Sequence, residues 1–172
     1  MSVRLGLVTA ALFATPAVAA DKEPCAAGMV CASKPDTIAT EMQRAGYRAA
    51  MVKDKDGDPS IDSAGSGYDF SILFYGCEAT KACDSIQFYA SFANDQRHDA
   101  AIANKWNGTK RFSQLAIAED GDLVLRRDLS TVGGLTPKNF ADELDWWTHM
   151  LGAFSRFLDE NRKSAKPPRP AG

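Results

Sequence analysis

Two runs of alternating apolar and polar residues, joined by a loop that carries two cysteines, constrain this chain more than any other feature. Asp69–Tyr75 and Ser85–Phe92 both repeat with the two-residue period of a half-buried β-strand. Two such runs with a short connection favour an antiparallel hairpin. Cys77 and Cys83 lie in the connection, where a disulfide would hold the end of that hairpin.

The four cysteines form two groups with the same spacing, Cys25 with Cys31 and Cys77 with Cys83. In an exported chain an even number of cysteines predicts disulfides, because the compartment is oxidising. Four cysteines allow three pairings, and we favour the two short loops. A zinc site of four thiolates is disfavoured, because its paired cysteines usually have about two to four residues between them. We therefore expect no metal site and no cofactor.

Residues 1–20 have the pattern of a signal peptide. A basic residue precedes the apolar run Leu5–Phe13, and a small-x-small cleavage signature follows. Cleavage after Ala19 or after Ala20 fits this signature, and we take Ala20. The apolar run is shorter than the roughly 20 residues that span a bilayer. We expect a periplasmic or extracellular protein with no integral membrane segment once the signal is removed.

Charge and composition divide the rest of the chain. We expect a stapled leader at 21–35, a single globular domain at 36–160 and a disordered, basic, proline-rich tail at 161–172. The tail holds four basic residues and no acid, which leaves residues 21–160 with a net charge of −7. This acidic body argues against a nucleic-acid binder, which relies on positive charge.

The periodicity and turn signals predict an α+β domain with the element order α-β-β-β-β-α-β-β-α. We expect a twisted antiparallel sheet with helices packed mainly on one face. Besides the two strands named above, the expected elements are a helix from a cap at Asp36 to Ala45, strands at Tyr47–Lys53 and Ser60–Ser63, a helix from Asn94 or Asp95 to Trp106 that ends at Asn107-Gly108, strands at Arg111–Ala118 and Leu123–Leu129, and a long helix capped by Thr136.

The last helix has an unusually wide apolar arc, built from two neighbouring stripes. The first stripe is Phe140, Leu144, Trp147, Leu151, Phe154 and Leu158, and the second is Trp146, Met150, Ala153 and Phe157. Either the helix lies in a groove of a curved sheet and is buried on two sides, or the second stripe contacts a partner. Together with the open face of the sheet, this gives a candidate partner surface of Tyr75, Tyr89, Trp146, Met150 and Phe157.

Few side chains are arranged for catalysis. His149 follows Asp145 by one helical turn, and His98 is the other histidine, but no nucleophile is placed beside either. An exposed pair one turn apart is a common solvated arrangement. We therefore name no catalytic residue.

Several short strings of the sequence are distinctive: Ala45-Gly46-Tyr47, Gly57-Asp58-Pro59, Phe70-Ser71-Ile72, Phe74-Tyr75-Gly76-Cys77, Ser85-Ile86-Gln87-Phe88, Trp106-Asn107, Lys110-Arg111-Phe112, Asn139-Phe140 and Trp146-Trp147. In this order they resemble the YbjN family of bacterial sensory transduction regulators. They cover roughly residues 35–158, and the cysteines make the chain similar to an exported branch of the family. The resemblance implies a fold like that of type III secretion chaperones and brings no established catalytic residues.

The first functional hypothesis is an exported, non-enzymatic binding or regulatory module of the YbjN type, with chaperone-like action as one form of it. It would act on a protein partner or a second copy of itself as a homodimer. One alternative is an exported hydrolase or other enzyme on an unfamiliar scaffold. A cleft that joins a histidine to a serine or threonine would favour it. The other is a structural envelope protein without a dedicated ligand.

Overall fold

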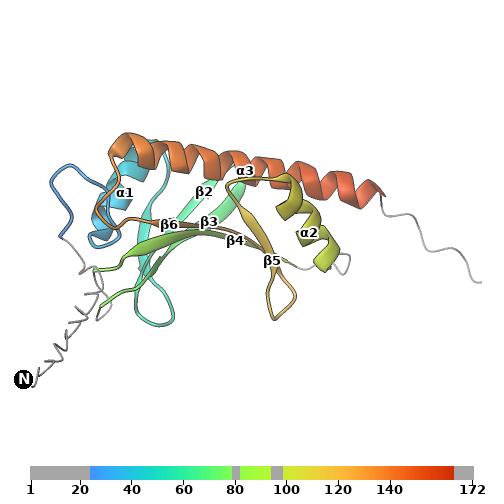
Figure 1. Cartoon of the computed structure of the whole chain (residues 1–172), viewed down its shortest axis with the longest axis horizontal. Helices are drawn as coiled ribbons and strands as arrows, with labels where there is room; N and C mark the ends of the chain where they lie inside the picture. The colour runs from blue at the N-terminus through green and yellow to red at the C-terminus, as the bar shows by residue number, and fades with distance from the viewer. Residues whose placement is uncertain (1–23, 79–81, 94–98, 165–172) are drawn as a thin grey trace, which may run out of the picture.

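The computed structural model describes residues 24–78, 82–93 and 99–164, and these residues form three helices and one sheet. The elements are α1 (Pro35–Arg44), β1 (Ala50–Lys53), β2 (Pro59–Gly65), β3 (Tyr68–Tyr75), β4 (Ser85–Phe92), α2 (Ala100–Thr109), β5 (Gln114–Ile117), β6 (Leu123–Ser130) and α3 (Pro137–Ser164). Figure 1 shows the helices lying over the sheet. The predicted α+β class and element order are confirmed.

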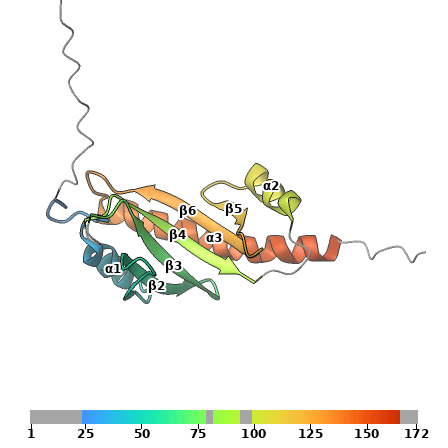
Figure 2. The ribbon, with the colours of Figure 1, turned by 90° about the horizontal axis from the view of Figure 1, so that it is seen from below.

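The six strands form one antiparallel sheet with the order β1-β2-β3-β4-β6-β5. The first four strands follow one another as a meander. The chain then forms α2 and returns, so that β6 pairs with β4 along its whole length and β5 takes the outer edge. Seen from below in Figure 2, the strands lie in front of α3, with no helix between them and the viewer.

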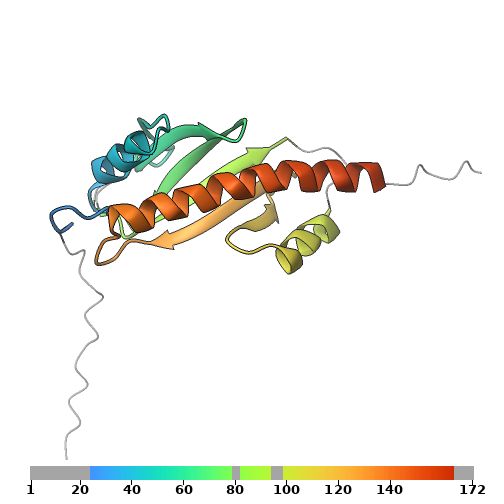
Figure 3. The same cartoon turned by 90° about the horizontal axis from the view of Figure 1, so that it is seen from above.

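The core lies between the sheet and α3, which crosses the sheet diagonally in Figure 3. The Phe88 ring of β4 stacks on Trp147 at 5.6 Å and on Phe140 at 6.4 Å between centroids. All three are fully buried, and each such side chain stabilises the fold by about 2–3 kcal/mol. The first stripe of α3 therefore faces the sheet, as its spacing indicates.

The predicted cap of the last helix, α3, agrees with the structure, whereas the predicted cap of the first helix, α1, does not. The Thr136 hydroxyl accepts a hydrogen bond from the Asn139 amide at 3.2 Å, which confirms the predicted cap of α3. The cap at Asp36 is wrong, because α1 begins at Pro35 and Asp36 lies in its first turn. Proline is favoured there, since its missing amide hydrogen has no partner to lose.

Helix α2 starts and ends at other residues than the sequence pattern indicates. Asp99 caps it by accepting hydrogen bonds from two backbone amides of the first turn. The expected caps, Asn94 and Asp95, lie outside the described residues. The predicted stop at Asn107-Gly108 is wrong, and the helix continues to Thr109. The Asn107 side chain instead exchanges two hydrogen bonds with the backbone of Leu115 in β5, at 2.8 and 3.0 Å.

Part of the leader is packed into the domain, and the first residues of the expected tail belong to a helix. In the leader, Val30 and Ala32 are buried in the core, and the backbone of Val30 exchanges hydrogen bonds with Leu135. Helix α3 continues to Ser164, so the first four residues of the expected tail are helical. Residues 165–172 and the predicted signal peptide at 1–20 lie outside the described residues.

Candidate functional site

One face of the sheet carries no helix in the described part of the chain, and we call it the uncovered face. Alternate positions of four strands place their side chains on it, as the two-residue period requires. Its residues are Asp62 of β2, Ser71, Leu73 and Tyr75 of β3, Gln87 and Tyr89 of β4, and Arg126 and Asp128 of β6. The prediction that Tyr75 and Tyr89 share a face opposite the core is therefore confirmed by the register.

A chain of hydrogen bonds crosses three strands of the uncovered face. The Tyr75 hydroxyl donates to Oε1 of Gln87 at 3.4 Å, and Nε2 of Gln87 donates to Oδ1 of Asp128 at 2.7 Å. The Gln87 side chain is nearly buried, whereas the Tyr75 side chain is 45% exposed. Both ends of the Gln87 amide are thus satisfied, which fixes its orientation and holds the tyrosine in place.

The Tyr75 phenol is chemically different from a free tyrosine. Partial burial raises its pKa above the ordinary value of 10.0, and the carboxylate of Asp128 raises it further. The guanidinium of Arg126 opposes this effect. Tyr75 is therefore a neutral hydrogen-bond donor throughout the physiological pH range, and it offers its exposed ring to a partner.

Tyr89 lies at the edge of a shallow hollow on the same face. In register, it stands between Ser71 of β3 and Arg126 of β6. The hollow is lined with both acidic and basic groups: Arg48, Asp62, Ser63, Asp69, Phe70, Ser71, Tyr89, Ala90 and Ser91. This mixture of phenol, hydroxyl and charge is typical of a polar protein interface.

The second stripe of α3 is mostly core, which favours burial of the helix on two sides over a partner contact at Met150 and Phe157, the two alternatives that the sequence left open. Met150 and Phe157 are each only 6% exposed. The reason is α2, whose buried Trp106 contacts Phe157 edge to face at 5.2 Å. Figure 3 shows α2 beside the C-terminal part of α3. Only Trp146, at 38%, keeps an exposed side chain.

A cluster around Phe112 was not predicted from the sequence. Its ring stacks on Trp146 at 4.5 Å, and the guanidinium of Arg127 lies over the same ring at 4.9 Å. Arg127 also forms an ion pair with Glu143 of α3 and donates to the Phe112 carbonyl. Phe112 has φ +64°, a left-handed conformation that costs a non-glycine residue about 1 kcal/mol or more. The strand β5 begins after this residue, at Gln114, and not at Arg111 as predicted. The string Lys110-Arg111-Phe112 was the available signal.

A groove on the exposed side of α3 is lined by Asp142, Asp145, Trp146 and His149, and we call it the α3 groove. The His149 ring meets Trp146 edge to face at 5.8 Å. Asp145 and His149, the pair considered for catalysis, therefore share one groove, but its lining contains no serine, threonine or cysteine. His98 lies outside the described residues.

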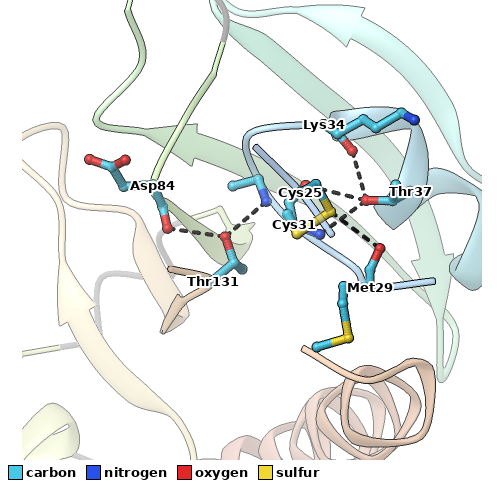
Figure 4. Close-up of a disulfide and its surroundings, with 8 residues drawn as sticks. Cys25, Met29, Cys31, Lys34, Thr37, Asp84 and Thr131 are labelled. Atoms are coloured by element: carbon cyan, nitrogen blue, oxygen red, sulfur yellow. Dashed lines mark hydrogen bonds between the residues drawn. A yellow bond between two sulfur atoms is a disulfide. The ribbon is translucent and has the colours of Figure 1, made fainter. Parts of the chain in front are cut away.

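Both disulfides lie at the end of the sheet where the leader enters. Cys25 is joined to Cys31 and Cys77 to Cys83, the pairing that the spacing favours. Figure 4 shows the first bridge beside Thr131, whose hydroxyl lies between the leader and the backbone of Asp84. The two bridges fasten the leader and the β3–β4 connection at one end of the molecule.

In the ranges 24–78, 82–93 and 99–164, no group of three or more histidine, cysteine or acidic side chains is placed to hold a metal ion. Within the same ranges, no helix combines the length and the apolar character that crossing a bilayer requires.

Comparison with known proteins gives one match. No curated protein and no solved structure matches the chain. The model of the YbjN family, described as "Putative bacterial sensory transduction regulator", matches residues 34–160. The match begins at the cap of α1 and ends within α3, and it includes every strand and the whole uncovered face. The chain therefore belongs to the YbjN family.

Proposed function

We propose that this protein is an exported regulatory module that binds a protein partner on the uncovered face of its sheet. The description of the family as "Putative bacterial sensory transduction regulator" supports a regulatory role. The observation that carries the proposal is the position of Tyr75 and Tyr89. Both lie on a face that all three described helices leave free.

The uncovered face has the chemistry of a protein interface. Tyrosine is enriched in such interfaces, because its ring buries apolar area while its hydroxyl forms a hydrogen bond. Tyr75 is already held by Gln87, so ordering its side chain on binding costs little entropy. We expect a partner with apolar groups for the two rings and hydrogen-bonding groups for Asp62 and Arg126. A chaperone-like action, with a client protein held on this face, is the form we favour.

Export is part of the proposal. Residues 1–20 act as a signal peptide, cleavage follows Ala20, and the leader at 21–35 and the domain at 36–160 reach the periplasm. The two disulfides support this, because such bonds persist in oxidising compartments and are rare in the cytosol. The tail at 161–172 supplies basic charge to an acidic body.

Comparative affinity capture tests the proposal. The purified, oxidised protein is immobilised, and proteins retained from a periplasmic extract at moderate salt are identified by mass spectrometry. The same capture is repeated with Tyr75→Ser/Tyr89→Ser. Val132→Ser is the matched control, because Val132 is a 54% exposed apolar residue in the loop after β6 and is not one of the strand residues that form the uncovered face.

The expected result is one protein retained near stoichiometrically by the unchanged chain and by the Val132 control, and lost with the double tyrosine variant. Equal retention by all three chains would place the contact elsewhere. Retention of nothing above background would favour a small ligand, an enzyme or a structural role. Circular dichroism of each variant confirms that the comparison is made between folded proteins.

A further inference from the structure

We propose that the α3 groove binds the basic, proline-rich segment Lys166–Pro170 of a second copy of this chain. The groove is formed by Asp142, Asp145, Trp146 and His149 on the side of α3 that faces away from the sheet. The proposal goes beyond the proposed function, because it assigns a contact between copies to a surface separate from the uncovered face.

The segment has the chemistry that such a groove recognises. Its sequence is Lys-Pro-Pro-Arg-Pro. Proline fixes its own backbone and restricts the residue before it, so this sequence favours the extended polyproline II conformation. Proline-rich segments of this kind bind aromatic-lined grooves, and they do so at a low entropic cost because their conformation is already limited.

Trp146 provides the aromatic surface. Its side chain is 38% exposed, which is high for a tryptophan in a folded domain. Phe112 stacks on it at 4.5 Å, and the guanidinium of Arg127, which is paired with Glu143, lies over the Phe112 ring at 4.9 Å. The ring is therefore held in one position before any ligand arrives, which reduces the entropic cost of binding.

Asp142 and Asp145 provide the complementary charge. Both carboxylates are exposed, and neither forms an ion pair with any residue in the described part of the chain. Lys166 and Arg169 of the segment are separated by two prolines and carry the opposite charge. In such a complex, the positive charge of the tail at 161–172 would neutralise part of the negative charge of residues 21–160 in the other copy.

The length of the chain decides which copy supplies the segment. Helix α3 runs without interruption from Pro137 to Ser164 (Figure 3), so Trp146 lies about 27 Å from the helix end at 1.5 Å per residue. Fully extended, the six residues from Ser164 to Pro170 cover only about 21 Å. Lys166 and Arg169 lie closer still to the helix end. The segment of one chain therefore falls short of its own groove but can enter the groove of another.

A reciprocal exchange of two tails closes a twofold dimer, in which each copy gives one segment and receives one. Because the attraction is partly between exposed charges, self-association weakens as salt rises. The uncovered face takes no part in this exchange, so it stays open to the partner of the proposed function.

Sedimentation velocity of the purified full chain, over a concentration series at low and moderate salt, tests the proposal. Two charge reversals are compared, Asp142→Lys/Asp145→Lys in the groove and Lys166→Glu/Arg169→Glu in the tail. Asp56→Lys/Glu119→Lys is the matched control for the groove reversal, because it makes the same change in net charge as that reversal, at exposed turn residues. The tail reversal changes no residue of the described helices and strands, so it remains informative even if the groove reversal unfolds the domain.

The unchanged chain is expected to dimerise, and each reversal to weaken the dimer by about tenfold or more, while the control keeps it. In a mixture of the two reversed chains, both groove–tail contacts join opposite charges again, so a heterodimer forms. A chain that stays monomeric at every concentration, a dimer that neither reversal weakens, or a mixture that fails to associate would each overturn the proposal.

Discussion

The hydroxyl of Thr131 accepts a hydrogen bond from the backbone amide of Ala32 at 2.8 Å, and so joins two residues that are 99 positions apart. The same hydroxyl donates to the carbonyl of Asp84, just before β4, at 3.0 Å. Thr131 is almost completely buried. One side chain therefore ties the leader, the start of β4 and the end of β6 into a single end of the molecule.

Replacing Thr131 by valine keeps its shape but removes these hydrogen bonds. The buried amide of Ala32 is then left without a partner, which costs about 1–3 kcal/mol of unfolding free energy. Urea denaturation measures the loss. Thr40→Val in α1 is the matched control, because Thr40 is exposed and should lose about 0.5 kcal/mol or less. Equal stabilities for the two variants would show that Thr131 has no such linking role.

The two disulfides close loops of equal size, with a sequence separation of 6 in each. The chain-entropy model then predicts that Cys25→Ala/Cys31→Ala and Cys77→Ala/Cys83→Ala each lose about 2 kcal/mol of unfolding free energy. Denaturation of the oxidised variants measures both values. An unchanged stability for either variant contradicts this account, as would a strong difference between them after correction for buried area.

Arg127 and Glu143 form an ion pair that is largely shielded from water, with 14% and 23% of their side chains exposed. Glu143→Gln should leave Arg127 without a counter-charge and lower the unfolding free energy by roughly 2 kcal/mol. The pair of Arg48 and Asp69, with 62% and 91% of their side chains exposed, is the control, and Asp69→Asn should cost about 0.5 kcal/mol or less. Thermal denaturation measures the stability of both variants, and a smaller effect at Glu143 than at Asp69 is the contrary outcome.

The two ends of the second α3 stripe should respond differently to the same substitution. Phe157→Asp places a carboxylate against buried Trp106 and should unfold the protein. Trp146→Asp, at a half-exposed site, should leave a folded chain with reduced stability. Far-ultraviolet circular dichroism of the two variants makes the comparison. A folded Phe157→Asp chain would restore the stripe as a surface.

Tyr75 gives a prediction about pH. Because its pKa is raised in the folded chain, its contribution to stability is fully present below the ordinary value of 10.0 and is lost as the pH rises through the folded value. Absorbance titration of the unchanged chain minus that of Tyr75→Phe isolates this phenol. Its midpoint should lie above 10.0. A midpoint at or below that value would show that burial and Asp128 do not act on it.

Most of the sheet could be predicted from the sequence, because each strand has one buried and one open face. The strand Ser85–Phe92 and the two faces of its side chains follow from alternation alone, and its bounds agree with the structure. Local sequence signals gave the wrong element boundary where a side chain forms a tertiary contact instead of ending a helix. Asn107 has the sequence of a helix stop, but its side chain is used to pair with Leu115.

The candidate sites were less predictable than the fold. Alternation placed Tyr75 and Tyr89 on one face, but not the hydrogen bonds through Gln87 that order them. Helical spacing identified two stripes on α3 but could not tell which would be covered. That depends on the packing of α2, whose Trp106 buries Phe157 but does not reach Trp146. A left-handed phenylalanine at 112 has no sequence signature.

The most direct test of partner binding on the uncovered face is site-specific photocrosslinking in living cells. A photoreactive phenylalanine derivative is placed at Tyr75 or Tyr89, and at Lys138, an exposed residue on α3, as the control. Adducts of one defined mass at both tyrosine positions, and none at Lys138, are the predicted result. Adducts at Lys138 alone, or at none of the three positions, would contradict the proposal that this face binds a protein.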